Sequence, residues 1–453
     1  MAKKPHVIIF LTDQQRWDST GLAGNPEGLT PHLDHAARRG AFFDVPITPQ
    51  PLCTPARSCL QTGRFATSTG VHRNGIPLGE EPDALARIYA AAGYQTGYIG
   101  KWHLGDVESA GPVRRDQRAG YDHWLAANLL ELTSDAYSTT LWDDSGEAVD
   151  LPGYRVDAVA DAAIRFIDAH ADDEQPFFLF VSFLEPHHQN SRDDYPPPEA
   201  YSGRYQGAWL PPDLASLGGT AHRQIDGYYG MIKRLDEAYG RMTDALRSLE
   251  IAEDTVVAFT SDHGNHFKTR NSEYKRSVHD ASVRVPLVLT GPGVPQGRYV
   301  QEVVSTLDLL PTLLELSEVP VPGSYQGRSL VELMRHCESD WSDEAFIQVS
   351  ESEVARAVRT RRWKYGVRAR DAHPVEDPGS DVYEEAYLYD LQADPHELRN
   401  LFDAASHRGV REVLEEKLLA WMAHAQEPLP RILAAEPSAK PSNLTLSDGD
   451  QFA

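Results

Sequence analysis

The sequence contains very little cysteine. Its 453 residues include three, Cys53, Cys59 and Cys337. Three cysteines cannot form the disulfide framework that stabilises many secreted domains, and an odd number leaves at least one thiol unpaired. Because a reducing compartment is the simplest setting for such a chain, we predict a cytoplasmic protein.

Long hydrophobic runs are also missing. The apolar run near the N-terminus spans about six residues and ends at Asp13, which is too short for a signal-peptide core. The longest run elsewhere, residues 176–184, falls well below the roughly 20 residues that a membrane helix needs. The sequence therefore predicts neither a secretory signal nor a membrane partner.

Positive charge is scarce. The chain has 43 Lys and Arg residues against 67 Asp and Glu residues, which gives a formal net charge of −24. Nucleic-acid binding requires a basic face, so a nucleic-acid partner is not expected. An anionic substrate would be repelled at long range, and a site for one must therefore concentrate its own positive charge.

The apolar residues that are present form short runs separated by helical patterns. Runs that end abruptly in polar residues are typical of buried strands, and they cover residues 6–11, 95–99, 177–183, 255–260 and 286–289. Amphipathic stretches at residues 156–169 and 231–249 predict helices between them. This alternation predicts an α/β domain over residues 1–340, with a large mixed, mostly parallel sheet between helices.

The pattern changes after residue 322. Short strand-like segments occupy residues 346–350, 357–360, 363–367 and 387–389, and a helical pattern covers residues 407–425. They predict a small α+β subdomain over residues 341–430, with its own antiparallel sheet. Residues 431–453, rich in Pro, Ser and Asp, are predicted to form an extended tail.

Reactive side chains follow four of the predicted strands. The pairs are Asp13-Gln14, Lys101 with His103, His187-His188 and Asp262-His263. Ligands of open α/β sheets bind beyond the carboxyl ends of the strands, so these residues meet at one edge if the strands are neighbours. Carboxylate, amide and imidazole ligands together favour Ca²⁺, Mg²⁺ or Mn²⁺ over metals that prefer thiolates.

The segment PLCTPARSCLQTGR, residues 51–64, holds Cys53 and, one helical turn later, Arg57. By residue type alone, Cys53 is a candidate thiolate nucleophile at a helix start. The spacing Cys-x-Pro-x-Arg followed by Thr-Gly-Arg also resembles the signature of the formylglycine-dependent (type I) sulfatases, in the alkaline phosphatase superfamily. Four further segments resemble blocks of that family: residues 93–103, 262–264, 284–287 and 387–397.

The resemblance implies an alkaline-phosphatase-like sandwich and a sulfuric ester hydrolase. It implies that a maturation enzyme oxidises Cys53 to formylglycine. It also implies that this residue helps to bind one divalent cation, for which Ca²⁺ is the expected metal and Mn²⁺ or Mg²⁺ are alternatives. The other implied metal ligands are Asp13, Gln14, Asp262 and His263.

The resemblance also implies the roles of the catalytic side chains. One hydroxyl of the hydrated aldehyde would attack sulfur, and Arg57 would steady the diol. Lys101 and Lys275 would neutralise the sulfuryl oxygens. His187 would protonate the leaving oxygen, and His103 would take a proton from the second hydroxyl so that sulfate leaves.

Three positions depart from the common family pattern or are ambiguous. Gln14 and His263 stand where many members have Asp and Asn, a pairing that resembles choline-sulfatases and phosphonate monoester hydrolases. Lys275 competes with Lys268 and Arg276 for its role, and its spacing before residues 284–286 favours it. The alternatives are therefore a phosphonate monoester or phosphodiester hydrolase on the same scaffold, and a non-catalytic binder of sulfated glycans.

The substrate is expected to be a small-molecule or saccharide sulfate ester. Candidate substrate-binding residues are His188, His266 and Arg270, because specificity usually lies in loops. The basic run over residues 356–365 predicts either an anion-facing strand or an interface. The sequence leaves the oligomeric state open.

Overall fold

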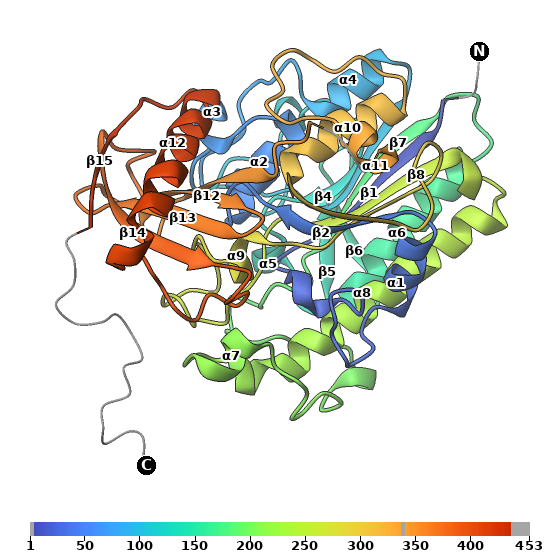
Figure 1. Ribbon diagram of the computed structural model, residues 1–453. Coiled ribbons are helices and arrows are strands. Elements are labelled where there is room, and N and C mark those ends of the chain that lie inside the picture. The colour runs from blue at the N-terminus through green and yellow to red at the C-terminus, as the bar shows by residue number, and fades with distance from the viewer. Residues whose placement is uncertain (1–3, 337–339, 436–453) are drawn as a thin grey trace.

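The computed structural model describes residues 4–336 and 340–435, which form two β-sheets and the helices around them (Figure 1). Cys337 and residues 436–453 of the predicted tail lie outside the described part. None of the described helices combines the length and the apolar character that crossing a membrane requires.

The larger sheet has ten strands. From one edge to the other they are β10 (Arg298–Ser305), β2 (Ala41–Ile47), β9 (Leu287–Thr290), β8 (Thr255–Ser261), β1 (His6–Thr12), β7 (Phe177–Ser182), β3 (Gln95–Lys101), β4 (His123–Ala127), β5 (Thr139–Trp142) and β6 (Ala148–Leu151). The central strands β8, β1, β7, β3 and β4 run parallel, and antiparallel pairs flank them on both sides. The predicted mixed, mostly parallel sheet is confirmed.

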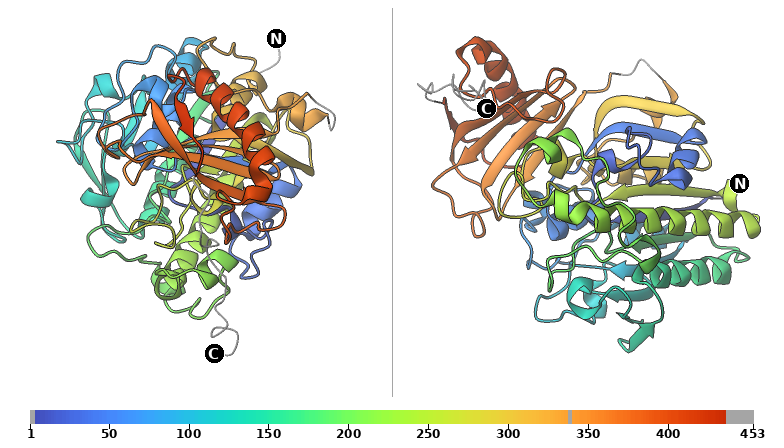
Figure 2. Two further views of the ribbon diagram at one scale, coloured as in Figure 1. Left: turned by 60° about the vertical axis from the view of Figure 1, so that its left-hand side comes forward. Right: turned by 90° about the horizontal axis from the view of Figure 1, so that it is seen from below.

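Helices cover both faces of this sheet because its central strands are apolar on both sides. Along β1, Ile8 and Phe10 pack into one core cluster, whereas Val7, Ile9 and Leu11 pack into another, as expected for alternating side chains. The first face is covered by α1 (Pro31–Arg38), α6 (Arg155–His170) and α8 (Ala221–Ser248), and the second by α4 (Leu85–Ala91), α10 (Leu309–Leu316) and α11 (Val331–Arg335). The long helices α6 and α8 lie side by side along their face in Figure 2.

The smaller sheet is formed by the C-terminal part of the chain. Its strands are β11 (Glu344–Val349), β12 (Val354–Thr360), β13 (Trp363–Ala369), β14 (Val382–Asp390) and β15 (Arg431–Leu433). The first four are antiparallel, and α12 (Arg408–His424) packs on them through Leu414 and Leu418. β15 pairs parallel with β14, so the first residues of the predicted tail join this sheet.

The shorter described helices connect these layers. They are α2 (Cys53–Thr62), α3 (Ala66–Thr69), α5 (Leu130–Thr133), α7 (Pro212–Ser216) and α9 (Asp280–Val283). Two of them matter for chemistry, because α2 begins at Cys53 and α5 lies beyond the end of β4.

Candidate active site

The carboxyl ends of four neighbouring parallel strands bring the predicted site residues together. The strands β8, β1, β7 and β3 are adjacent in that order. Asp13 follows β1, Asp262 follows β8, and Lys101 ends β3. Backbone hydrogen bonds join the segments at the strand ends. Asp13 N donates to Glu185 O (3.2 Å), and Asp262 N donates to Thr12 O (3.1 Å). The convergence expected from the sequence is confirmed.

Cys53 lies at the centre of this group and is buried. Its Sγ atom is 2.8 Å from Lys275 Nζ, 3.3 Å from His263 Nε2 and 3.8 Å from Asp13 Oδ1. Ligand atoms of Asp13, Cys53, Asp262 and His263 all lie within 4.8 Å of one another. Two carboxylates, a sulfur and an imidazole therefore surround one point, as a cation site requires.

Arg57 fixes the orientation of both carboxylates. It lies one turn after Cys53 on α2, so the two side chains share a helix face. Its guanidinium donates to Asp13 Oδ2 (3.0 Å) and Asp262 Oδ2 (3.1 Å), and also to Ser182 Oγ (2.7 Å). The two Oδ1 atoms lie instead 3.5 and 3.6 Å from His263 Nε2. One oxygen of each carboxylate thus faces the guanidinium, and the other faces the imidazole.

The tautomer of His263 is set by the backbone. Its Nδ1 lies 2.9 Å from the Gly264 carbonyl oxygen, which can only accept a hydrogen bond, so Nδ1 carries the proton. The lone pair of Nε2 is then directed toward Cys53 and Asp13, which is the form that binds a metal. Gln14 adopts a left-handed backbone (φ 70°), and its buried Nε2 has no hydrogen-bond partner among the described residues.

Charge coupling shifts the ionisation of these buried groups. Burial alone would raise the pKa of Cys53, but Lys101, Lys275 and His263 lower it well below its usual value. Burial and Cys53 oppose ionisation of Asp13, yet neighbouring cations, Lys101 first among them, hold the pKa of its carboxyl below the usual range. The pKa of Asp262 is raised by burial and then by the Asp13 carboxylate. The pocket therefore stabilises negative charge at Asp13 and at residue 53.

Lys275 is the basic residue of the 268–276 loop that reaches the site. Its Nζ lies 3.2 Å from His187 Nε2 and 3.0 Å from His263 Nε2. Lys268 pairs instead with Asp193 (2.8 Å) and Arg276 with Glu351 (2.7 Å). His187 Nδ1 donates to the carbonyl of the next residue (2.6 Å), so its Nε2 is free to accept a hydrogen bond from the Lys275 ammonium.

The three predicted substrate-binding residues have different surroundings. His188 lies at the edge of the site, stacked on His187, with Nδ1 3.3 Å from Gln14 Oε1. His266 is completely buried, with Nε2 3.0 Å from the Lys275 carbonyl oxygen. Arg270 donates to two carbonyl oxygens of the 396–397 turn (both 2.9 Å). His188 is therefore the one of the three that lies next to the predicted ligands.

Glu131 belongs to the site although no motif pointed to it. It comes from the short helix α5, and its side chain is buried. Its Oε1 atom lies 3.1 Å from Lys101 Nζ and 3.8 Å from His103 Nδ1. The pairing of β4 with β3 carries α5 to the end of β3, and the chain shows no local signal for that contact.

A second acidic cluster does not have the properties of a cation site. Asp18, Asp213 and His396 also bring potential ligand atoms together. The guanidinium of Arg16 lies between the carboxylates, 2.6 Å from Asp18 Oδ2 and 2.9 Å from Asp213 Oδ1. An internal cation already neutralises this cluster.

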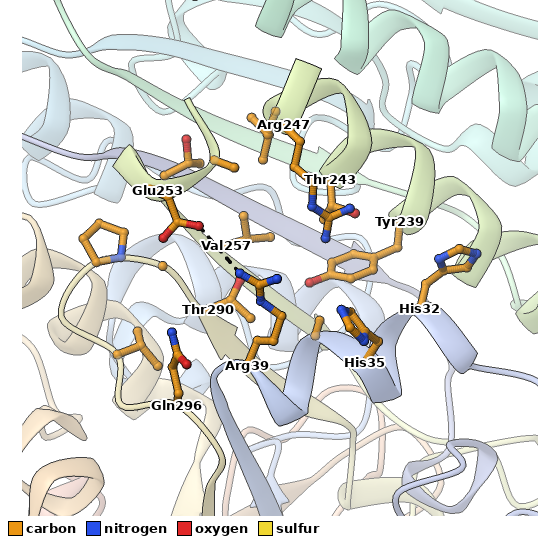
Figure 3. A pocket seen from close by; sticks show the side chains of 17 residues that line it. His32, His35, Arg39, Tyr239, Thr243, Arg247, Glu253, Val257, Thr290 and Gln296 are labelled. Atoms are coloured by element: carbon orange, nitrogen blue, oxygen red, sulfur yellow. Dashed lines mark ion pairs between the residues drawn. The ribbon is translucent and has the colours of Figure 1, made fainter. Parts of the chain in front are cut away.

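A cavity of about 280 Å³ lies at the other end of the large sheet (Figure 3). Thr255, the first residue of β8, lines it, whereas Asp262 follows the last residue of β8. Arg39 faces Glu253 across it at 3.7 Å, and Arg247 is paired with Asp244. None of the predicted site residues lines this cavity, and it is separate from the active site.

Comparisons with known proteins agree with this arrangement. The Sulfatase family model matches residues 5–319, and the model of the N-sulphoglucosamine sulphohydrolase C-terminal region matches residues 272–424. The chain is 30% identical to an ulvan-active sulfatase of Formosa agariphila, over 92% of this chain and 80% of that protein. It is 24% identical to an N-acetylglucosamine-6-O-sulfatase of Bacteroides thetaiotaomicron, over 91% and 86% of the two chains.

Solved structures show the same fold. A crystal structure of a protein named as the sulfatase yidJ of Bacteroides fragilis superimposes with a TM-score of 0.82 at 25% identity, covering 95% of this chain and 97% of that one. The family model covers well over half of the chain, and the predicted alkaline-phosphatase-like fold is confirmed. The chain therefore belongs to the sulfatase family of the alkaline phosphatase superfamily, a family of sulfuric ester hydrolases.

Proposed function

We propose that the protein hydrolyses a sulfate ester carried by a saccharide, using a formylglycine made from Cys53 and one divalent cation. The observation that carries this proposal is the buried convergence of Arg57, Lys101 and Lys275 on Cys53 in a chain with a net charge of −24. A site of this kind places cationic groups beside the position where an anion must bind and lose its leaving group.

The donor set fits a hard divalent cation. Asp13 and Asp262 each direct one oxygen toward His263 Nε2, and the backbone N–H of Gln14 donates to Asp262 Oδ1 (3.1 Å). Because oxygen ligands dominate, Ca²⁺ is our first choice, with Mn²⁺ or Mg²⁺ as alternatives. When bound, the cation would lower the cost of placing negative charge at residue 53 and on the sulfuryl oxygens.

A hydrated aldehyde at residue 53 would supply one hydroxyl as nucleophile and a second through which the sulfate is later expelled. Around it, Arg57 holds the two carboxylates in place, while Lys101 and Lys275 neutralise the sulfuryl oxygens. His187 would protonate the leaving oxygen, with Lys275 assisting, because the Lys275 ammonium lies 3.2 Å from His187 Nε2 and can supply a proton there. His103, whose ring contacts the Cys53 thiol, is the base for the second hydroxyl.

The saccharide substrate is supported by the relatives, two of which are named for sulfatase action on ulvan and on N-acetylglucosamine-6-O-sulfate. The proposal also requires a formylglycine-generating maturation enzyme as a partner, and it keeps the cytoplasmic location predicted from the sequence. A non-catalytic glycan binder would not need a complete set of acid, base and cationic side chains. The described site holds side chains chemically able to fill each of these roles, which supports the enzyme over the binder.

The direct test is co-production with a formylglycine-generating enzyme, followed by mass spectrometry and kinetics. Conversion should make the Cys53 peptide lighter by about 18 Da. The converted protein should then hydrolyse nitrophenyl sulfate with a higher kcat/KM than phenyl phosphonate, and O- and N-sulfated saccharides would be compared next. A higher kcat/KM for the phosphonate would favour the phosphonate hydrolase, and binding of sulfated glycans without turnover would favour the binder.

A matched pair of cysteine variants controls this test. Cys53→Ala should abolish turnover, whereas Cys59→Ala should retain it. Cys59 is buried on the same helix, and burial raises the pKa of its thiol far above the ordinary value. Full activity in Cys53→Ala would refute the proposed mechanism.

A further inference from the structure

Glu131 is a buried carboxylate that the proposed chemistry does not yet use. Its Oε1 atom contacts Lys101 Nζ at 3.1 Å, while its buried Oε2 atom has no hydrogen-bond partner among the described residues. Lys101 in turn divides its ammonium between Glu131 and Asp13, whose Oδ2 lies 2.8 Å away. A carboxylate buried in this way costs free energy unless a nearby cation compensates it.

The charge state of Glu131 is set by the active site and not by the fold around it. Burial alone would raise the pKa of Glu131, but Lys101, His103 and His187 lower it to about 2. Its backbone is fixed from the same direction, because Gln189 Nε2 donates to the Glu131 carbonyl oxygen (2.8 Å). The carboxylate is thus held ionised and in place by the segments that carry the predicted catalytic residues.

His103 lies between this carboxylate and residue 53. Its Nδ1 is 3.8 Å from Glu131 Oε1, is buried, and has no hydrogen-bond partner among the described residues. The ring also lies next to Cys53, where a hydrogen bond from His103 favours the thiolate; because Nδ1 has no such partner in the described part of the chain, the donor to that thiolate is Nε2–H. In the hydrated aldehyde, hydroxyls replace the thiolate and can donate to Nε2 instead. The order carboxylate, imidazole, nucleophile position is the arrangement that fixes a histidine tautomer in acyl-transfer enzymes. The 3.8 Å separation is longer than a hydrogen bond but lies within ion-pair distance.

We propose that Glu131 is a positioning residue that keeps the proton of neutral His103 on Nδ1, so that the lone pair of Nε2 faces residue 53. The inference rests on the proposed function, because it assigns His103 as the base. Glu131 touches neither substrate nor the reacting atoms, and it acts through His103 and Lys101. When His103 takes a proton at Nε2, the ring becomes a cation, and the Glu131 carboxylate compensates that charge.

The experiment compares Glu131→Gln, which removes the charge at nearly constant shape, with Glu131→Asp, which keeps it. In converted protein, kcat for nitrophenyl sulfate should fall by about 10- to 100-fold in the Gln variant, with KM changed by less than about threefold. The Asp variant should recover at least about tenfold of that loss, because it keeps the negative charge. Leu132→Ala is the matched control, since Leu132 lies next to Glu131 on α5 and is 61% exposed. Its kcat should stay at the wild-type value.

A second readout does not depend on turnover. In ¹⁵N-histidine-labelled Cys53→Ala protein, which lacks the thiolate that would hold a proton on Nε2, the His103 signals are assigned by their loss when His103→Gln is added. They should report a proton on Nδ1 when Glu131 is present and a smaller Nδ1-protonated population when Glu131→Gln is added.

Three results would overturn the inference: the same His103 tautomer in both proteins, a folded Gln variant with wild-type kcat, or no advantage of Asp over Gln. If the wild type failed to hydrolyse sulfate esters, the proposed function would fail, while the tautomer comparison would still decide the role of Glu131.

Discussion

A buried lysine, Lys364, joins the two sheets, and removing its charge should destabilise the protein strongly. Lys364 lies in β13 and is fully buried. Its Nζ is 2.5 Å from Asp280 Oδ1, on α9 beside the large sheet, and 2.5 Å from Glu397 Oε1, beyond the small sheet. Asp280 N also donates to Glu397 Oε2 (2.6 Å). The two carboxylates therefore share one ammonium.

The size of the effect follows from what Lys364→Met would leave behind. Asp280 would keep Arg359 at 3.2 Å, but Glu397 would lose the ammonium that its Oε1 contacts. Breaking a buried pair by removing one partner typically costs about 3–5 kcal/mol, because the other charge stays buried. The matched control is Lys417→Met, since Lys417 is 43% exposed and pairs with Glu344 at 2.7 Å. An exposed pair contributes about 0–1 kcal/mol.

The loss should also depend on pH, with a defined sign. Burial raises the pKa of Glu397, Lys364 lowers it, and the Asp280 carboxylate raises it again, with a net upward shift. Without Lys364 the folded-state pKa of Glu397 lies still further above the unfolded value of about 4.3. When the pKa of a group is higher in the folded than in the unfolded state, the group contributes to the free energy of unfolding at pH values below its unfolded pKa. This contribution is lost as the pH rises through the folded pKa. The deficit of Lys364→Met should therefore grow as the pH rises above the unfolded pKa of about 4.3 and through the raised folded pKa of Glu397.

Urea unfolding at several pH values, followed by tryptophan fluorescence, measures this deficit. The chain has eight tryptophans to report on it. The double variant Lys364→Met/Glu397→Gln should recover part of the loss, because it removes the carboxylate left without its cation. A loss no larger than that of Lys417→Met, or a deficit that shrinks with rising pH, would refute the reasoning.

Two further predictions concern the metal ligands. Exhaustive chelation should abolish sulfate-ester hydrolysis and lower the melting temperature, because a bound ion at 100 times its Kd stabilises the folded state by about 2.7 kcal/mol. Ca²⁺ should restore both properties, whereas metal-free protein with full activity, checked by elemental analysis, would contradict the proposal. Gly264→Ala should lower both stability and kcat, because its Cβ would lie 2.2 Å from the Ala281 carbonyl oxygen and displace His263. Gly409→Ala is the control, because no atom lies within 4 Å of its new Cβ. If the two variants behaved equally in thermal unfolding and kinetics, the close approach of Gly264 to the Ala281 carbonyl would be shown to be unimportant.

The central sheet could be predicted because its strands are buried on both faces. β1, β7 and β8 are continuous apolar runs, so their type and their abrupt polar ends are visible in the sequence. β5 and β6 have four residues each, and β2 contains Asp44 and Pro46, so their patterns are too short or too interrupted to predict strands. Their pairing depends on neighbours that are distant in the chain.

The candidate site was predictable where chemistry follows directly after a strand or lies within a family signature. Glu131 has neither property, because it lies on a single helical turn and approaches Lys101 through the pairing of β4 with β3. The basic run over residues 356–365 is in part paired within the chain. Within that run, Arg359 and Lys364 pair with carboxylates of the same chain, Asp280 and Glu397. Sequence reveals the charges but not their partners.

The internal pairing of charges changes how an acidic protein can attract a sulfate ester. The site places three cationic side chains against three carboxylates, namely Arg57, Lys101 and Lys275 against Asp13, Asp262 and Glu131. These six groups balance when all are ionised, so they orient an anion but supply little net attraction. Conversion of Cys53 to an uncharged aldehyde would remove a thiolate, and a divalent cation would then make the pocket positive. On this argument the affinity for the sulfate group depends on maturation and metal together, whereas the lysines and Arg57 mainly determine where the negative charge lies.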